Sequence, residues 1–112
     1  MLDTRVNYIS SNSKYEVVIY DDSPEKDYLL VGRGCLVIDR KMEGKPAGLV
    51  EDIWVHEDYR KQGLGKDIMR RLKEIAEKKE CYKMVLICAE HNIPFYESCG
   101  FYKHQVGMRL DV

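Results

Sequence analysis

The chain has 112 residues, of which 45% are hydrophobic and 33% are charged, so residues 1–112 are expected to form one domain around a single core. Its formal net charge of −1 provides no overall basic field, which argues against nucleic acid or an anionic membrane as the partner. No apolar stretch approaches the ~20 residues that span a bilayer, and no signal-peptide core follows Met1, so we expect a cytoplasmic protein.

The first half of the chain is predicted to be β-structure. Alternating apolar and polar residues indicate strands at residues 15–20, 28–31 and 35–38. Gly32 and Gly34 indicate a bend or a bulge before the third of these strands. Residues 41–46 are typical of a hairpin turn that leads into the next strand. An antiparallel meander is therefore expected before residue 50.

The second half is predicted to hold a strand–helix–strand unit. Residues 50–55 are strand-like, and residues 84–88 are continuously apolar, as in a strand covered on both faces. Between them, three- and four-residue steps predict an amphipathic helix whose apolar side carries Leu64, Ile68, Leu72, Ile75 and Ala76. A crossover helix between two such runs makes a right-handed unit with parallel strands.

The chain is predicted to end with a short helix and a strand. Asn92 suits an N-cap, Pro94 the first helical turn and Gly100 a left-handed C-terminal position, which indicates a helix at residues 93–99. Alternation over residues 102–110 predicts a final strand. The expected fold class is α/β (α+β), a mixed central sheet in which an antiparallel meander is followed by a parallel strand pair.

The loop at residues 60–66, of sequence RKQGLGK, joins the central strand to the helix. Gly63 and Gly65 permit positive φ and close approach of a ligand, and backbone N–H groups at the positive end of a helix dipole can hold a phosphate. The loop lacks the Gly-Lys-Ser/Thr ending of a P-loop, and Ile68 replaces the third glycine of the dinucleotide fingerprint. The pattern Gly-x-Gly also occurs in ordinary turns that bind nothing. By itself it therefore leaves open whether this loop is a phosphate site or only a turn.

Two other residue types have a structural interpretation. The cysteines show no Cys-x-x-Cys spacing and are interpreted as reduced core residues: Cys35, Cys81, Cys88 and Cys99. No metal is expected, because metal-ligand spacing is absent among His56, His91 and His104.

With these neighbours, the loop resembles the signature Arg/Gln-x-x-Gly-x-Gly/Ala of the GNAT superfamily of acyl-CoA-dependent N-acetyltransferases. The resemblance covers roughly residues 47–108, and its motifs are most similar to those of the glucosamine 6-phosphate N-acetyltransferases. The matching segments are Val50-Glu51-Asp52-Ile53, Tyr59-Arg60, Gly63-Leu64-Gly65-Lys66, Cys81-Tyr82-Lys83 and Phe95-Tyr96-Glu97-Ser98-Cys99-Gly100-Phe101.

The resemblance implies that the loop binds the pyrophosphate of acetyl-CoA and that the pantetheine arm lies between two splayed parallel strands, near residues 49–55 and 83–88. The cofactor-binding residues that it implies are Ile53, Trp54, Val55, Arg60, Lys61, Gln62, Gly63, Leu64, Gly65, Lys66, Asn92, Phe95 and Tyr96. A capping role would explain Asn92 equally well, and the bulky Trp54 would also suit a core or a dimer interface.

The resemblance further implies that the Tyr96 hydroxyl protonates or hydrogen-bonds the departing thiolate. It assigns catalytic and substrate-binding roles near the acceptor amine to Glu51 and Asp52, and it puts Ile87 and Cys88 in the acceptor region. Neighbours in a regular strand point to opposite faces, so Glu51 and Asp52 are not expected to act on one atom. Ile87 stands where the sugar-phosphate enzymes have a carboxylate.

One departure from the superfamily is large. Its usual domain has two helices between the first and second strands, and no helical period of that length precedes residue 50. A homodimer would bury the apolar surface that such helices cover. We therefore expect acetyl transfer from acetyl-CoA to a small primary amine, with glucosamine 6-phosphate as the first candidate. Another amine, such as a peptide amino terminus, and a coenzyme A binding module without turnover remain alternatives.

Overall fold

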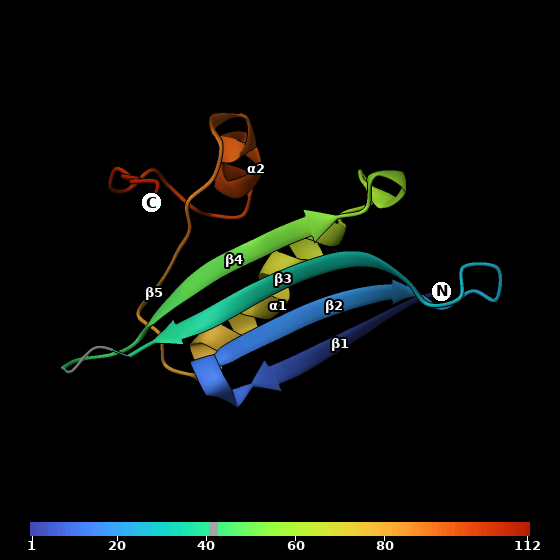
Figure 1. Ribbon diagram of the computed structural model, residues 1–112, viewed down its shortest axis with the longest axis horizontal. Helices are drawn as coiled ribbons and strands as arrows, with labels where there is room; N and C mark the ends of the chain where they lie inside the picture. The colour runs from blue at the N-terminus through green and yellow to red at the C-terminus, as the bar shows by residue number, and fades with distance from the viewer. Residues whose placement is uncertain (41–42) are drawn as a thin grey trace.

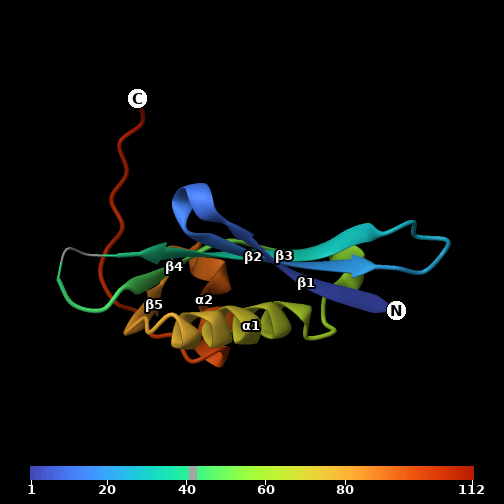
Figure 2. The same ribbon diagram turned by 90° about the horizontal axis from the view of Figure 1, so that it is seen from below.

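A computed structural model describes residues 1–40 and 43–112, and within them one mixed sheet carries a long helix on one face (Figures 1 and 2). The strands are β1 (Leu2–Ile9), β2 (Lys14–Asp21), β3 (Leu29–Asp39), β4 (Ala47–Val55) and β5 (Lys83–Val85), and the α-helices are α1 (Leu64–Lys78) and α2 (Ile93–Ser98). Short 3-10 turns follow β1, β4 and β5 in the chain: η1 (Ser10–Asn12), η2 (Glu57–Tyr59) and η3 (Glu90–Asn92).

The strands lie in their chain order, β1-β2-β3-β4-β5. The pairs β1–β2, β2–β3 and β3–β4 are antiparallel, and β5 runs parallel to β4 after the crossover through α1. The predicted fold class is therefore confirmed. The connection from β1 to β2, residues 10–13, contains the 3-10 turn η1, and α1 is the first α-helix in the described part of the chain, as the sequence predicted.

The core lies between α1 and the sheet. Ile68 and Leu72 of α1 are fully buried against Val17, Val31 and Leu36 of the strands. Burial of each such side chain contributes about 1.5–3 kcal/mol, so this face accounts for much of the stability of the fold.

Gly34 lies inside β3 and allows α1 to approach the sheet. A Cβ atom at Gly34 would overlap Ile68 and lie 2.7 Å from Cδ1 of Ile53. The predicted bulge is confirmed, because the register of β3 shifts beside Gly32 against β2 and at Gly34 against β4. The two short strands predicted on either side are one strand, residues 29–39, and Gly34 also provides space for the helix.

Other element predictions also need correction. β1 was not predicted, because it is an edge strand whose side chains are mostly exposed, so it has no buried period-two pattern. β5 ends at Val85 rather than at Cys88. The predicted turn at residues 41–46 falls partly outside the described residues.

The predicted strand at residues 102–110 is wrong. Residues 102–112 have no strand pairing and run away from the sheet, and large apolar side chains in this segment are exposed (Figure 2). Alternation reports a preference for extended backbone, but a strand also needs a partner edge, which the pattern does not specify.

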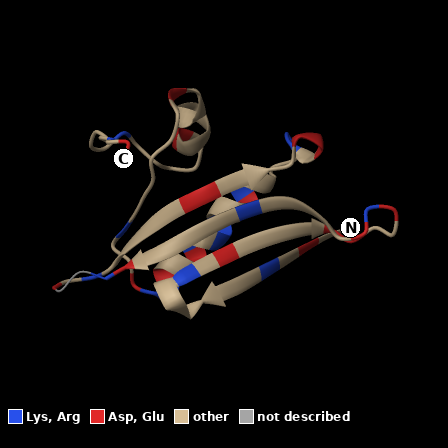
Figure 3. Cartoon of the chain, in the orientation of Figure 1, with Lys and Arg blue, Asp and Glu red and all other residues tan. Residues whose placement is uncertain are grey.

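The face of the sheet opposite α1, here called the open face, is not covered by an α-helix within the described residues (Figure 2). Charged residues of both signs form a band across the four long strands (Figure 3). The open face is therefore an accessible polar surface beside the end of β4.

Candidate functional site

A cleft of about 660 Å³ opens where β4 and β5 separate. The two strands are paired only from Ala47–Leu49 to Lys83–Val85, and β4 continues alone to Val55. The residues that line the cleft come from the end of β4, the glycine loop, α1, η3 and α2: Ile53, Trp54, Val55, Arg60, Lys61, Gly63, Leu64, Gly65, Lys66, His91, Asn92, Phe95 and Tyr96. Segments far apart in the sequence thus share one hollow.

The glycine loop presents the N-terminus of α1 to this cleft. Lys61 and Gly63 have left-handed backbones, with φ of 63° and 81°. The first helical hydrogen bond runs from the Asp67 N–H to the Gly63 carbonyl at 3.0 Å, so the N–H groups of residues 64–66 have no helical acceptor. Together with the helix dipole and the nearby basic side chains, these groups make a site for an anion.

The two glycines of the loop have different roles. A Cβ atom at Gly63 would have nothing within 4 Å, which leaves the backbone there open to a ligand. At Gly65 a Cβ atom would lie 2.9 Å from Cζ of Phe95. The prediction that both glycines serve ligand approach is therefore incomplete, because Gly65 allows α2 to pack on the first turn of α1.

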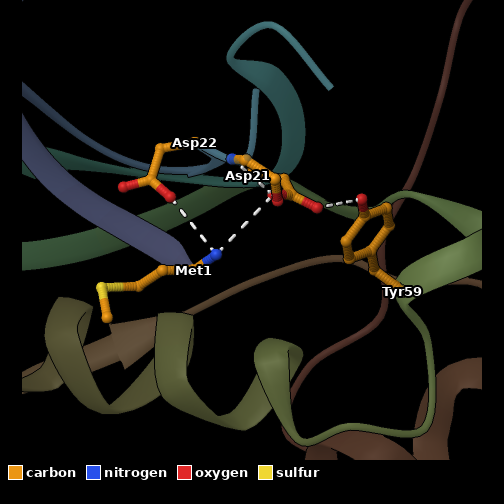
Figure 4. A network of polar contacts seen from close by, with 5 residues as sticks. Met1, Asp21, Asp22 and Tyr59 are labelled. Atoms are coloured by element: carbon orange, nitrogen blue, oxygen red, sulfur yellow. Dashed lines mark hydrogen bonds and ion pairs between the residues drawn. The ribbon is translucent and has the colours of Figure 1, made fainter. Parts of the chain in front are cut away.

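A polar link fixes the turn that precedes the loop (Figure 4). The Tyr59 hydroxyl at the end of η2 donates to the Asp21 carboxylate at the end of β2. Hydrogen bonds from Ser23 and from Tyr59 lower the pKa of Asp21 to about 2, and the same carboxylate raises the pKa of Tyr59 to about 12. The amino group of Met1 lies 3.3 Å from Asp22 in the same network.

Two further contacts hold the backbone of the turn and the loop. The Nδ1 atom of His56 accepts from the Asp58 N–H at 3.1 Å, and Nε of Arg60 donates to the Val55 carbonyl at 3.1 Å. The approach to the loop is thus hydrogen-bonded on both sides of η2.

Tyr96 of α2 contributes a phenol to the cleft wall. Its ring packs edge-on against Phe95 and Phe101, with centroid separations of 5.1 and 6.0 Å. Burial raises the pKa of Tyr96, and the thiols of Cys88 and Cys99 add to the rise. The hydroxyl therefore stays protonated at neutral pH and can act as a donor.

The predicted N-cap position of Asn92 is confirmed, as are the neighbouring predictions, but the expected side-chain cap is absent. Asn92 lies at the N-cap of α2 but makes no side-chain capping hydrogen bond, and it lines the cleft instead. Pro94 lies in the first turn of α2, and Gly100 has φ of 98°, as expected.

A bulge in β4 changes the position of the two carboxylates. Cys35 pairs with Glu51 and Arg33 pairs with Trp54, so β4 has one residue more than β3 between these pairs. Asp52 takes a left-handed backbone there, with φ of 57°.

Because of the bulge, both carboxylates are on the open face. Asp52 lies 3.8 Å from Lys14 and 3.7 Å from Arg33, which belong to that face, and Glu51 is in register with Cys35. The prediction that Glu51 and Asp52 point to opposite faces is wrong, because it assumed a regular strand.

A second, shallower groove of about 400 Å³ lies on the open face and is lined by Leu30, Arg33, Asp52, Ile53 and Trp54. Ile53 and Trp54 line both hollows, so the groove borders the cleft. Trp54 is 42% exposed, which excludes the interpretation that it is a core residue of this chain.

Several predicted residues lie apart from these hollows. Gln62 is in the loop but does not line the cleft, and neither Glu51, Ile87 nor Cys88 lines either hollow. Ile87 is 87% exposed. His91 was left out of the predicted site although it lines the cleft, and its place directly before Asn92 was the available signal.

In residues 1–40 and 43–112 no three residues of the types His, Cys, Asp and Glu are grouped so that they could hold a metal ion. Neither described α-helix is long and apolar enough to cross a membrane.

Comparisons with known proteins agree on one family. The sequence profile of the Acetyltransferase (GNAT) family matches residues 3–101. A glucosamine 6-phosphate N-acetyltransferase of Trypanosoma brucei brucei is 42% identical over 85 residues, which are 74% of this chain and 58% of that protein. The chain spans little more than half the length of this and other curated relatives.

Solved structures share the fold. A crystal structure of an acetyltransferase from Trypanosoma brucei superposes with a TM-score of 0.88 and 29% identity, and the match covers 100% of both chains. A glucosamine-6-phosphate N-acetyltransferase from Arabidopsis thaliana gives a TM-score of 0.81 and 26% identity over 89% of this chain and 67% of that chain.

Proposed function

Because the chain belongs to the Acetyltransferase (GNAT) family, we propose that its residues 1–112 act as one domain that transfers an acetyl group from acetyl-CoA to a small primary amine. Glucosamine 6-phosphate is the first acceptor to test, since similar proteins carry that activity in their names. When bound, acetyl-CoA supplies an acetyl thioester that an amine can attack.

The observation that carries this proposal is the meeting of the β4 end, the glycine loop, α1 and α2 at one cleft. Open space at Gly63 and the free N–H groups at the start of α1 suit the diphosphate of coenzyme A. Arg60, Lys61 and Lys66 add positive charge beside it. Backbone groups of residues 53–55 are available to pair with the pantetheine amides in the manner of an added strand.

The proposed proton donor to the leaving sulfur is Tyr96. Tyr96 lines the cleft, and its hydroxyl remains protonated, because burial raises its pKa. A phenol in this state can donate a proton or a hydrogen bond to a departing thiolate.

Of the two carboxylates, Glu51 is the better candidate for accepting the amine proton through water. Asp52 is engaged by Lys14 and Arg33, whereas Glu51 has no ion pair or hydrogen bond with a described side chain. An amine with a pKa near the ~7.7–8.0 of an α-amino group is largely neutral at pH 8, so a weak base is sufficient.

Another amine, such as a peptide amino terminus, is the second candidate acceptor. Ile87 favours it, because this residue, which follows β5, stands where the sugar-phosphate enzymes have a carboxylate, and an isoleucine cannot make that hydrogen bond. The third candidate function is coenzyme A binding without turnover.

The test is thiol release from acetyl-CoA with a panel of amines: glucosamine 6-phosphate, glucosamine, a peptide with a free amino terminus and a simple alkylamine. We expect release that depends on both the protein and one class of amine, with the reaction lacking amine as the control. If the protein binds coenzyme A but releases no thiol with any of the amines, acetyl transfer is contradicted, and coenzyme A binding without turnover becomes the function.

We further propose that the protein is a cytoplasmic homodimer. Its cysteines are free thiols, which suits a reducing compartment. Exposed apolar residues along β1 and residues 102–112 provide surface that a second copy could bury.

A further inference from the structure

We propose that Ser23 is a phosphorylation site for a proline-directed protein kinase, and that its phosphate breaks the link between Asp21 and Tyr59. The modification would loosen the turn that leads into the glycine loop. Its effect on coenzyme A binding rests on the proposed donor site, whereas the modification itself and its effect on the turn do not.

The loop between β2 and β3 contains the sequence Ser23-Pro24-Glu25-Lys26. Ser23 and Pro24 are the single Ser-Pro pair of the chain, which has no Thr-Pro pair. Proline restricts the residue before it to an extended backbone, which suits binding of the serine in the substrate groove of a kinase. Because a two-residue motif is short, the position of the hydroxyl matters more than the motif.

A kinase can reach this loop. Residues 24–28 are exposed, and Ser23 is half-buried. The N–H groups of Lys26 and Asp27 donate to the Ser23 carbonyl at 2.9 and 3.2 Å, so the loop is a tight turn. Asp27 and Tyr28 end it with left-handed backbones, with φ of 50° and 57°. An exposed turn with strained residues opens at a lower free energy than the core strands beside it.

The Ser23 hydroxyl belongs to the polar link that fixes η2. Its Oγ atom donates to Oδ1 of Asp21, and its backbone N–H donates to the same oxygen at 3.0 Å. The Tyr59 hydroxyl donates to the other oxygen, Oδ2 (Figure 4). One carboxylate therefore joins the start of the β2–β3 loop to the end of η2.

Phosphorylation would replace this donor with an anion. The kinase transfers the γ-phosphoryl group of ATP: its bond to the oxygen of ADP breaks, a bond to Oγ of Ser23 forms, and the hydroxyl proton passes to a base of the kinase. The ester oxygen then has no proton to donate to Asp21. The phosphate carries about −1.5 to −2 charges at pH 7.

The charges already present oppose a phosphate at this position. Asp21 is ionised, since its pKa is about 2, and Asp22 follows it in the chain. The amino group of Met1 lies 4.0 Å from Asp21 and 3.3 Å from Asp22, so two carboxylates already share it. Like charges in contact repel, so the Asp21 carboxylate and the phosphate should move apart. The carboxylate would then leave the position in which Tyr59 reaches it.

The end of η2 is directly connected to the cleft. Tyr59 is followed by Arg60 and Lys61, which line the cleft. Arg60 also donates to the Val55 carbonyl at 3.1 Å, so the loop keeps one contact when Tyr59 is released. Without the second anchor the turn and the loop gain conformations, and a ligand must order them again when it binds, which lowers its affinity.

The first experiment tests the modification. The full chain is incubated with ATP and a proline-directed serine/threonine kinase, and the phosphate is located by peptide mass spectrometry. We expect phosphate on Ser23, none at this position in Ser23→Ala, and several-fold less in Pro24→Ala, which retains the hydroxyl. Absence of phosphate on Ser23, or equal incorporation in Pro24→Ala, would overturn the assignment.

Amide hydrogen exchange of the phosphorylated protein tests the effect on the turn without any ligand. We expect exchange at residues 57–63 to become about fivefold faster or more, and exchange at residues 68–76 of α1 to stay unchanged. Ser23→Ala is the matched control: it removes the donor but adds no charge, so its exchange should change less than about twofold. Unchanged or slower exchange at residues 57–63, or faster exchange throughout the chain, would contradict the release of a local link.

The Kd for coenzyme A tests the effect on the donor site. We expect phosphorylation to raise this Kd about fivefold or more in the wild type, and less than about twofold in Tyr59→Phe, which already lacks the link. No rise in the wild type, or an equal rise in both proteins, would overturn transmission through Tyr59. If the unmodified protein binds no coenzyme A, the proposed donor site fails, whereas phosphate on Ser23 with faster exchange at residues 57–63 would still support this inference.

Discussion

Tyr96 was assigned a role by resemblance, and the structure adds the physical basis: a partly buried phenol between two aromatic rings, with its pKa raised. The Tyr96 hydroxyl makes no hydrogen bond with another described residue. Removal of the hydroxyl should therefore change the free energy of unfolding little.

Tyr96→Phe should lower turnover roughly ten- to a thousand-fold, because it removes the proposed proton donor and retains the ring. Thiol-release kinetics would measure the loss, and the Kd for coenzyme A should change little. Tyr82→Phe, which alters a tyrosine outside both hollows, is the control. Wild-type turnover in Tyr96→Phe would remove this residue from the mechanism.

The sequence predicted this site only in part at the residue scale. Gly63 was predicted correctly as a position with positive φ, because glycine in a tight loop before a helix is a local pattern of the sequence. The contact of Gly65 with Phe95 joins distant parts of the chain, and no local pattern contains it. The bulge at Asp52 was likewise hidden, since its extra residue is defined only by pairing with β3.

At the scale of elements, the link from Tyr59 to Asp21 joins η2 to the end of β2 and so anchors the approach to the loop. Asp21 is stabilised as a carboxylate, because its pKa falls from 3.8 to about 2. Its contribution to stability is complete above the unfolded value and is lost as the pH falls from 3.8 toward 2. Tyr59 contributes as the neutral phenol, and this contribution is lost as the pH rises from 10.0 through about 12.

Tyr59→Phe should therefore lower stability in a pH-dependent manner. We expect the urea midpoint to fall by roughly a few tenths of 1 M between about pH 5 and about pH 9, and the difference from wild type to shrink below about pH 4. Urea unfolding across this range would measure it. A difference that stays constant down to about pH 2 would show that the hydrogen bond to Asp21 is not its source.

Elements with a buried face were predictable, and elements at the edges were not. α1 and β4 were located because their apolar residues must recur with the period of the structure that buries them. β1 and residues 102–112 have mostly exposed side chains, so the same rule does not constrain them. Whether such a segment pairs depends on which sheet edge is free, which is a property of the assembled fold.

At the scale of the whole molecule, exposed apolar side chains are concentrated outside the two hollows. Val6 and Tyr8 of β1 are 47% and 55% exposed, and Val106, Met108 and Leu110 are 85–91% exposed. A chain with this much exposed apolar surface gains by association, because burial removes that surface from water.

Light scattering at micromolar protein should therefore give twice the mass of 13.1 kDa. Replacing Val106, Met108 and Leu110 together by serine should shift the mass toward that of one chain. A wild-type monomer would contradict the proposed homodimer, and an unshifted dimer in the variant would move the interface to β1 or elsewhere.

The bulge in β4 has a consequence for how the sequence can vary. If Asp52 were absent, Ile53 would fall opposite Gly34, and β3 and β4 would pair residue for residue with every later side chain on its present face. The sheet thus contains a residue that its pairing does not require, in a backbone conformation that costs on the order of 1 kcal/mol. If folding alone were under selection, deletion of Asp52 would be favoured. Retention of Asp52 in sequences that descend from this chain would therefore indicate selection for a function of the open face.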